Sequence, residues 1–359
     1  MDFDLSPEQS MLYESVRRFC DESAPPLRLL RIYDGDEPLD RALWTGMAGI
    51  GLAGMLVPED FGGAGLGMLD TAVAAEALGY CAAPGPFLGH TLAAMALSIA
   101  GSPGQRRHWL PRLASGEIVA TLAASEGGER WLPDAWTLAP AGNRLSGTKT
   151  HVPFAADADL FIVGLRGGAL ALVERGASGL AAQDVDGIDR TRRIGTLRLQ
   201  DTPCEILPGA PDAADRIRDA ALLLLAADAY GGAWRSVEFT VDYLKTREQF
   251  GRPLASFQGI KHQVADMAAE VRPSQSLHWY AAYAFDRRPD EAPRMAALAK
   301  AHNTERFLHA SRRMVELHGG IGYTWKFHCQ AWVKRAMFDH AFFGMPALHR
   351  ERAAALAGW

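Results

Sequence analysis

The stretch REQFGRPLASFQ, which begins at Arg247, places an arginine, an aromatic ring, a glycine and an amide between two helical patterns. The planar guanidinium of Arg247 suits a phosphate group, because its fork of donors matches the phosphate oxygens. Phe250 and Gly251 predict a turn where the backbone can approach a ligand, and Gln258 supplies an amide at the next helix start. Arg247 has a second interpretation, as a cation that bonds the last carbonyls of its own helix.

A second glycine-rich stretch, ELHGGIGYTW from Glu316, follows another helical pattern. Gly319, Gly320 and Gly322 are three glycines within four positions, which is more than a helix cap needs. No strand pattern precedes them and their spacing differs from GxGxxG, so they do not predict a dinucleotide-binding fold. Their backbone amides are nevertheless suited to meet a phosphate.

Other chemistry has little support in the residue pattern. His302, His309 and His318 share one helical stretch, but no i, i+4 pair or adjacent carboxylate completes a metal site, so no metal is expected. No GxSxG nucleophile elbow occurs, which leaves hydrolysis without support. The cysteines lie far apart without a CxxC pair, which excludes a zinc ribbon and indicates a reducing compartment: Cys20, Cys81, Cys204 and Cys329.

The elements that must position these residues are mostly helices. Ser6, Pro7 and Gln9 predict a capped helix start, and glycine and proline breaks separate the helical patterns that follow. Short β-prone runs begin near Glu117 and predict an antiparallel β region, whereas long helical periodicity returns after Pro211 and is typical of a four-helix bundle. We therefore predict a mostly α, α+β chain with three domains: an N-terminal helical domain (1–116), a middle β domain (117–211) and a C-terminal bundle (212–359).

The charge pattern excludes several classes of partner. The 37 basic and 42 acidic residues give a net charge of -5 and are interspersed, so neither a nucleic-acid-binding arm nor a polybasic membrane anchor is predicted. The polar start lacks the features of a secretory signal, and the most apolar run, from Ala220, is too short to cross a bilayer. We expect a cytoplasmic protein.

Three stretches together closely resemble the acyl-CoA dehydrogenase family: LVPEDFGGAGLG, TREQFGRPLASFQGIKHQVADM and ELHGGIGYTW, in this order and at these separations. The resemblance extends along nearly the whole chain. It implies a flavoenzyme in which FAD lies at a subunit interface. In that family a glutamate removes the α-proton of an acyl-CoA while the β-hydride goes to the flavin. An electron-transfer flavoprotein or a similar acceptor then takes the electrons.

The resemblance also implies which residues of this chain contact the FAD that a neighbouring subunit mainly holds. They are Arg247, Phe250, Gly251, Gln258, Glu316, Gly319, Gly320 and Gly322. Glu316 departs from the glutamine that the family often has there. A carboxylate beside a pyrophosphate is repulsive unless it turns away or is protonated.

The family pattern fails at the catalytic base. Most members place the glutamate directly before a glycine about two dozen residues after the GGxG loop, and Phe343 holds that position here, ahead of Gly344. Some members place it on the helix before the RxxFG motif, where Ala221 stands. Asp339 is a nearby carboxylate, but it lies about one helical turn before Phe343, and a solvated surface role is expected for it.

The β region departs from the family as well. Only Glu126 and Gly127 match the family's flavin-holding loop, and His151 and Pro153 replace the tryptophan and the hydroxyl residue of a second segment. Pro153 also removes a backbone donor. The missing residues therefore belong to the half of the site that a subunit builds for its own flavin and substrate, and the retained ones to the half contributed across the interface.

This division favours one hypothesis over two others. A subgroup of the family forms α2β2 enzymes in which one subunit carries the catalytic glutamate and the other completes the FAD site, and this chain resembles the second kind. Such complexes often act on steroid-derived CoA thioesters. The alternatives are a homomeric FAD-dependent acyl-CoA dehydrogenase with a non-standard base such as Asp339, and a binding or assembly protein of the same fold without redox activity.

Overall fold

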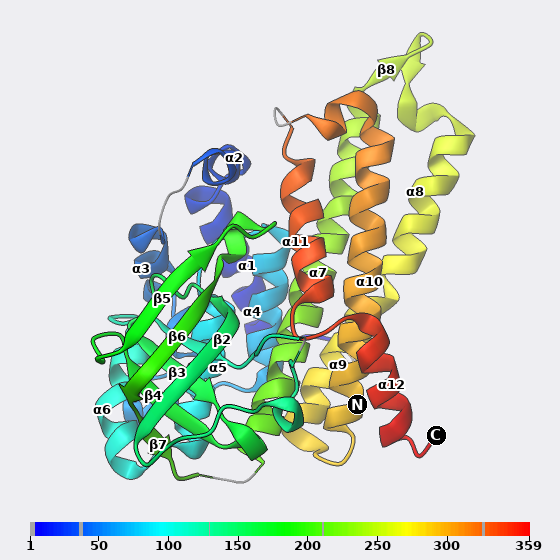
Figure 1. The fold of residues 1–359 in the computed structure, drawn as a ribbon. Coiled ribbons are helices and arrows are strands. Elements are labelled where there is room, and N and C mark those ends of the chain that lie inside the picture. The colour runs from blue at the N-terminus through cyan, green and yellow to red at the C-terminus, as the bar shows by residue number, and fades with distance from the viewer. Residues whose placement is uncertain (1–3, 36–38, 129, 210–211, 325–326) are drawn as a thin grey trace. The chain divides into compact units, whose positions relative to one another are not determined.

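The computed structural model of the protein describes residues 4–35, 39–128, 130–209, 212–324 and 327–359 (Figure 1). Helices come first, strands follow, and helices return, so the predicted order of elements and the mostly α, α+β class are confirmed. The chain forms two compact units. One contains Met1–Asp36, Ala72–Pro84 and Leu222–Trp359, and the other contains Glu37–Thr71 and Gly85–Ala221. The three-domain division stays a prediction.

The regular elements that the structure describes in the N-terminal third are all helices. The predicted capping box is present, because Ser6 Oγ accepts from the Gln9 amide at 3.2 Å and Gln9 Oε1 accepts from the Ser6 amide at 3.0 Å. The helices of this part are α1 (Pro7–Ser23), α2 (Pro26–Asp34), α3 (Arg41–Gly49), α4 (Met68–Tyr80), α5 (Phe87–Ala100) and α6 (Pro103–Ala114).

The strands form two sheets. One has the order β1-β3-β4-β7 and the other β2-β6-β5, and all their pairings are antiparallel except β1 with β3. Apolar side chains such as Phe161, Val163 and Leu197 build the core of this region. The strands are β1 (Ala120–Ala123), β2 (Arg144–Pro153), β3 (Leu160–Gly164), β4 (Leu170–Glu174), β5 (Leu180–Val185), β6 (Ile194–Pro203) and β7 (Glu205–Leu207).

The C-terminal region contains more helices than the four expected. Helical periodicity in the sequence predicts single helices over about 256–288 and about 328–357. The first divides at Pro273, which lacks the amide that would continue the helix, and the second divides around Gly344. The helices are α7 (Ala213–Thr246), α8 (Gln258–Val271), α9 (Pro273–Arg287), α10 (Ala292–His318), α11 (Cys329–Ala341) and α12 (Pro346–Leu356). Figure 1 shows a short hairpin, β8 (Glu248–Gln249) and β9 (Arg252–Pro253), beyond the end of α7.

The core of this bundle is apolar and aromatic. Phe307 and Met314 of α10 pack with Tyr230 of α7 and Trp332 of α11, all almost fully buried. Among the described residues, no helix combines the length and the apolar character that crossing a membrane requires. Because its core is packed in this way, the bundle holds its helix ends in fixed positions. The predicted ligand contacts lie at those ends.

Candidate cofactor-binding site

The hairpin after α7 displays an aromatic ring to solvent. Phe250 and Gly251 are the two loop residues between β8 and β9, with φ values of 55° and 77°. Positive φ at both central residues is the turn geometry that fits the twist of paired strands. Glycine adopts it freely, whereas a phenylalanine in this region costs roughly 1–2 kcal/mol. Phe250 is nevertheless 92% exposed, so packing within this chain does not explain the ring.

Arg247 follows the last residue of α7 and carries an exposed side chain. Its backbone amide donates to the Tyr243 carbonyl at 2.8 Å, and its carbonyl accepts from the Leu254 amide at 2.8 Å. Within the described part of the chain, no hydrogen bond or ion pair of the guanidinium is present. The group therefore does not bond the last carbonyls of α7, and its donors remain available to an external acceptor.

Phe257 and Gln258 form the start of α8 beside the hairpin. The rings of Phe250 and Phe257 meet edge to face with centroids 6.2 Å apart, and the Arg252 guanidinium lies 4.1 Å from the Phe257 ring centroid. Gln258 is the first residue of α8, and its side chain is exposed. The sequence pattern singled out the rings but missed Arg252, which the cross-strand pairing brings onto the same surface.

The three glycines after α10 are glycine for different physical reasons. Gly319 ends α10 with a φ of 64°, which favours glycine, and a Cβ on Gly322 would lie 2.6 Å from the Val315 carbonyl oxygen. Gly320 has neither constraint, because its φ is not positive and an added Cβ would meet no atom within 4 Å. The chain itself therefore gives no reason for glycine at position 320, whereas close approach of a ligand would.

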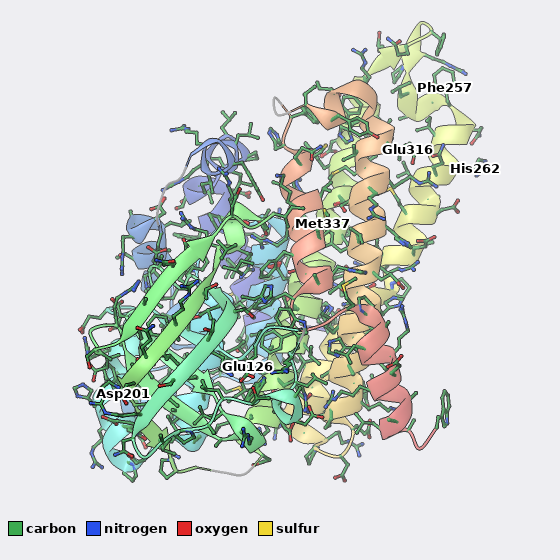
Figure 2. The ribbon with its side chains drawn as sticks, in the orientation of Figure 1. Glu126, Asp201, Phe257, His262, Glu316 and Met337 are labelled. Carbon is green, nitrogen blue, oxygen red and sulfur yellow. The ribbon has the colours of Figure 1, made fainter. Side chains whose placement is uncertain are left out.

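Two aromatic residues bring both predicted segments to one end of the bundle. The Tyr243 hydroxyl donates to the His318 carbonyl at 3.2 Å, and the two rings stack with centroids 4.3 Å apart. Tyr243 precedes Arg247 by one helical turn, and His318 directly precedes Gly319. Figure 2 shows Phe257 and Glu316 toward the same end of the bundle. The structure thus gathers the residues that the sequence placed in two separate motifs.

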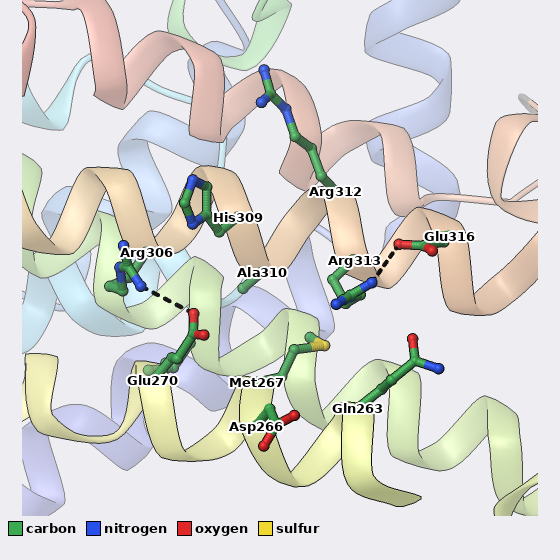
Figure 3. Close-up of a pocket in the computed structure, with 11 residues that line it drawn as sticks. Gln263, Asp266, Met267, Glu270, Arg306, His309, Ala310, Arg312, Arg313 and Glu316 are labelled. Atoms are coloured by element: carbon green, nitrogen blue, oxygen red, sulfur yellow. Dashed lines mark hydrogen bonds and ion pairs between the residues drawn. The ribbon is translucent and has the colours of Figure 1, made fainter. Parts of the chain in front are cut away.

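Glu316 turns toward a neighbouring arginine of its own helix. Its Oε2 accepts from Arg313 at 2.9 Å, and 62% of its side chain is exposed (Figure 3). The carboxylate is therefore paired with a cation of its own helix, and its relation to a phosphate stays a prediction. An exposed pair of this kind contributes only about 0.2–1 kcal/mol, so it orients the carboxylate weakly.

Figure 3 shows the polar groove beside Glu316, between α8 and α10. Its volume is about 290 Å³, and its charges largely pair with one another. Arg306 donates to Glu270 at 3.0 Å across the groove, as Arg313 does to Glu316 along α10. This internal pairing leaves the groove without a strong excess of either charge.

A second groove, between α7 and α8, is larger and mainly apolar. It has a volume of about 750 Å³ and lies next to the hairpin segment. Charged side chains occur at its margin, including Arg235 and Lys261. The apolar side chains that line it are Trp234, Val237, Val241, Leu244, Ala255, Ile260, Val264, Ala265 and Ala268.

The residues at the family's base positions are buried and apolar. Phe343 is 4% exposed and has a φ of 59°. Its carbonyl accepts from His349 Nε2 at 2.9 Å, and the Gly344 carbonyl accepts from Lys300 Nζ at 2.6 Å. Ala221 of α7 is fully buried. The backbone around Phe343 is therefore held firmly, but the side chain offers no proton acceptor.

Asp339 does not have the solvated surface role that we expected. Its side chain is fully buried on the face of α11 that also carries Trp332 and Ala336. Burial lowers the pKa of Lys300 to about 7, and the nearby charge of Asp339 opposes that shift. The expectation was wrong because the helical spacing from Trp332 places position 339 on the buried face despite its polarity.

In the β region, Glu126 at the family's flavin-loop position interacts with Lys149 of β2. Glu126 Oε1 accepts from Lys149 Nζ at 2.8 Å, and its carboxylate also accepts from the amides of Thr137 and Leu138. Burial alone would raise the pKa of Glu126, but the bonds from Lys149 and Thr137 lower it to about 2. Lys149 is fully buried. This ion pair occupies the interior instead of facing a ligand.

The second departing segment contains an unusual backbone. His151, where the family has tryptophan, has a φ of 53°, and its ring lies 4.9 Å from the Trp131 ring centroid. The Pro153 carbonyl accepts from the Thr121 hydroxyl at 2.7 Å. No cluster of three or more metal-ligating side chains occurs among the described residues.

Comparison with known proteins identifies the class. The model of the acyl-CoA dehydrogenase N-terminal domain matches residues 6–117, and that of the acyl-CoA dehydrogenase C-terminal domain matches residues 220–357. The chain belongs to the acyl-CoA dehydrogenase family, whose members are FAD-binding oxidoreductases.

Particular relatives are more informative than the class. The acyl-CoA dehydrogenase IpdE2 of Mycobacterium tuberculosis is 32% identical over 330 residues, which cover 92% of this chain and 91% of the relative. The Tcur3481-Tcur3483 steroid ACAD, solved as a variant, has a TM-score of 0.90 and 32% identity over 98% of each chain. The ChsE4-ChsE5 complex from Mycobacterium tuberculosis has a TM-score of 0.89 and 27% identity, with 100% and 99% of the two chains covered.

Proposed function

We propose that this chain is a non-catalytic subunit of a heteromeric FAD-dependent acyl-CoA dehydrogenase. It completes the FAD site of a homologous subunit that carries the catalytic glutamate, in an α2β2 assembly. One observation supports this most strongly. At one end of the bundle the side chains of Arg247, Phe250 and Gln258 are exposed, and the Arg247 guanidinium has no partner among the described residues, while Phe343 and Ala221 occupy both positions of the base.

The exposed end of the bundle fits the phosphate and adenosine side of FAD. Arg247 supplies a charge-assisted donor, and the backbone around Gly320 leaves room for a group to approach closely. Phe250 and Phe257 offer rings for stacking, and Gln258 offers an amide. The Arg313 contact directs the Glu316 carboxylate away from the phosphates. The proposed contacts are Arg247, Phe250, Gly251, Gln258, Gly319, Gly320 and Gly322, with Glu316 at the edge.

The half of the site that would serve a flavin of this chain has different chemistry. Phenylalanine and alanine cannot take the α-proton of a thioester, and Asp339 is fully buried close to Lys300. Glu126 is committed to Lys149. When bound, FAD supplies the hydride acceptor for α,β-dehydrogenation. The residues of this chain would hold its phosphates and exclude water, while proton removal belongs to the partner.

The apolar groove between α7 and α8 supports a subunit contact beside the cofactor. A contiguous apolar surface that adjoins exposed, strained residues is typical of an interaction site. Two of the similar solved proteins, Tcur3481-Tcur3483 and ChsE4-ChsE5, are named as pairs, and the first is named a steroid ACAD. These likenesses favour a bulky, steroid-derived acyl-CoA as the substrate of the complex. An electron-transfer flavoprotein or a similar acceptor would reoxidise the flavin.

The test is flavin stoichiometry. The chain is purified alone, and also after co-expression with a homologous subunit from the same genome that has a glutamate before the conserved glycine. We expect the chain alone to be colourless and inactive. The complex should be yellow, with one flavin for each pair of unlike subunits and with acyl-CoA dehydrogenase activity. Isolation of this chain by itself with tightly bound FAD and thioester-oxidising activity would refute the proposal.

A further inference from the structure

The turn that carries the three glycines is held at both of its ends. The His318 carbonyl, at the end of α10, accepts from the Tyr243 hydroxyl at 3.2 Å. At the other end, the Gly322 carbonyl accepts from Gln330 Nε2 of α11 at 2.9 Å. The three residues between these anchors, 319–321, are exposed. The position of the exposed backbone therefore depends on the two anchored residues.

The His318 ring is almost fully buried in a stack of aromatic rings. Its centroid lies 4.3 Å from that of Tyr243, 5.3 Å from that of Phe239 and 5.3 Å from that of Phe327. Tyr243 and Phe239 lie one helical turn apart on α7, and Phe327 precedes α11. The imidazole therefore lies where α7, the end of α10 and the segment before α11 meet, and its packing holds the start of the glycine turn against the other two elements.

The contacts of the two ring nitrogens define the protonation state of His318. Nδ1 lies 2.7 Å from the Met314 carbonyl oxygen, which can only accept, so Nδ1 carries a hydrogen. Nε2 is buried and has no hydrogen-bond partner among the described residues. A proton on Nε2 would place a positive charge and an unpaired N–H in the interior. The arrangement therefore selects the neutral ring with a bare Nε2.

Burial and the aromatic neighbours act on this charge in opposite directions. Burial lowers the pKa of His318, and the bond to the Met314 carbonyl opposes that shift. The faces of the neighbouring rings attract a cation, but they do not replace the acceptor that a protonated Nε2 requires. The neutral ring is therefore the form that fits the closed turn.

The carboxylates of the neighbouring helices are directed elsewhere. Glu316 of α10 pairs with Arg313, whereas Glu238 and Asp242 of α7 line the groove between α7 and α8. The other charged or titratable side chains beside the stack are phenols or bases: Tyr243 itself, Arg247 one helical turn beyond it, Arg235 over the Phe239 ring and His328 on the Phe327 ring. None of these groups therefore offers a carboxylate to a protonated His318.

We propose that neutral His318 is a positioning residue for the glycine turn, and that gain of a proton by its ring opens the turn and weakens FAD binding by the complex. The effect on FAD rests on the proposed function, whereas the behaviour of the turn does not. A ring that takes up its proton only outside the stack favours the open turn below the usual histidine pKa, near 6.5. The closed turn is therefore fully stable above that pH and loses stability as the pH falls toward the lowered pKa of the folded ring.

The first test uses the isolated chain with ¹⁵N-labelled histidine. Nuclear magnetic resonance at neutral pH should show a hydrogen on Nδ1 and a bare Nε2 at His318. Amide hydrogen exchange of residues 319–324, corrected for the intrinsic rate, should show that the turn opens as the pH falls below about 6.5. A ring that is charged at neutral pH, or a turn whose protection does not change with pH, would overturn the proposal.

The second test measures the affinity of the complex for FAD, by flavin fluorescence, between about pH 7.5 and 5.5. Below the usual histidine range the parent should lose affinity by up to about tenfold for each pH unit, as expected for one proton. His318→Phe keeps a ring in the stack without a titratable nitrogen, so this loss should disappear. His309→Phe, at an exposed histidine of the same helix, should keep the pH profile of the parent.

A third variant separates packing from protonation. His318→Asn keeps a donor near the Met314 carbonyl but loses the stacked ring, so its complex should bind FAD several-fold more weakly at both ends of the pH range. A His318→Phe complex with the pH profile of the parent would contradict the role of His318. A parent complex that binds no FAD at any pH would instead refute the proposed function, and the measurements on the isolated chain would then decide the role of His318 in the turn.

Discussion

Removal of the Arg247 side chain should weaken FAD binding by the complex but leave the stability of the isolated chain nearly unchanged. The guanidinium is exposed and makes no hydrogen bond or ion pair within the described residues. Its removal should therefore hardly change the stability of the isolated chain. We expect Arg247→Ala to change the free energy of unfolding of the isolated subunit by less than about 0.5 kcal/mol, which is the usual range for such surface positions.

In the complex the expected effect is larger. A charge-assisted hydrogen bond to a phosphate contributes about 1.5–3 kcal/mol, which corresponds to a roughly 10- to 150-fold weaker affinity for FAD. Arg247→Lys should lie between the parent and the alanine variant, because an ammonium keeps the charge but loses the planar fork. The assay is reconstitution of the flavin-free complex with FAD, followed by quenching of flavin fluorescence.

Arg288 provides a matched control. Like Arg247, it is an exposed arginine immediately after a helix, in this case α9. Arg288→Ala should leave the affinity for FAD unchanged. An Arg247→Ala complex that binds FAD as tightly as the parent, or an isolated Arg247→Ala chain destabilised by more than about 1 kcal/mol, would show that the arginine serves the subunit itself.

Three further predictions follow from neighbouring features. Gly320→Ala should leave the isolated chain stable but weaken FAD retention by the complex, whereas Gly49→Ala, at another glycine with open space around it, should affect neither; equilibrium dialysis of FAD distinguishes the two. Glu126→Gln should destabilise the chain by about 3–5 kcal/mol in urea unfolding, and Lys149→Met in the same chain should restore most of it. Because the folded-state pKa of Glu126 is lowered to about 2, its contribution is present at neutral pH. It is lost as the pH falls from the usual glutamate range toward 2, and the Glu126→Gln chain should lack that acid-dependent loss. Asp339→Asn should lower stability in thermal unfolding but leave turnover per bound flavin unchanged; a collapse of turnover would support a base at position 339 instead.

The sequence predicted local features well because their causes are local. The Ser6 capping box and the glycine turn at Gly251 depend on neighbouring residues, and both are present. Strand β5 (Leu180–Val185) was missed, since its alternating burial falls on small and polar residues instead of a β-branched run. The break at Pro273 was also missed, although proline at that position is a visible signal.

The arrangement of the site depended on contacts between distant residues. Tyr243 and His318 lie 75 positions apart, and periodicity does not report that their rings stack. The Lys149 and Glu126 pair joins two segments that the sequence treated as separate departures from the family pattern. The polarity of Asp339 suggested exposure, whereas its spacing from Trp332 indicated the buried face, and spacing was the better guide.

The buried pair of Glu126 and Lys149 constrains the two positions jointly. Substitution of either residue alone leaves the other charge buried without a partner. A lineage in which one of these positions changed first would pass through a destabilised intermediate. The ion pair thus couples the two positions, so that the loop of Glu126 and the strand of Lys149 can change only together.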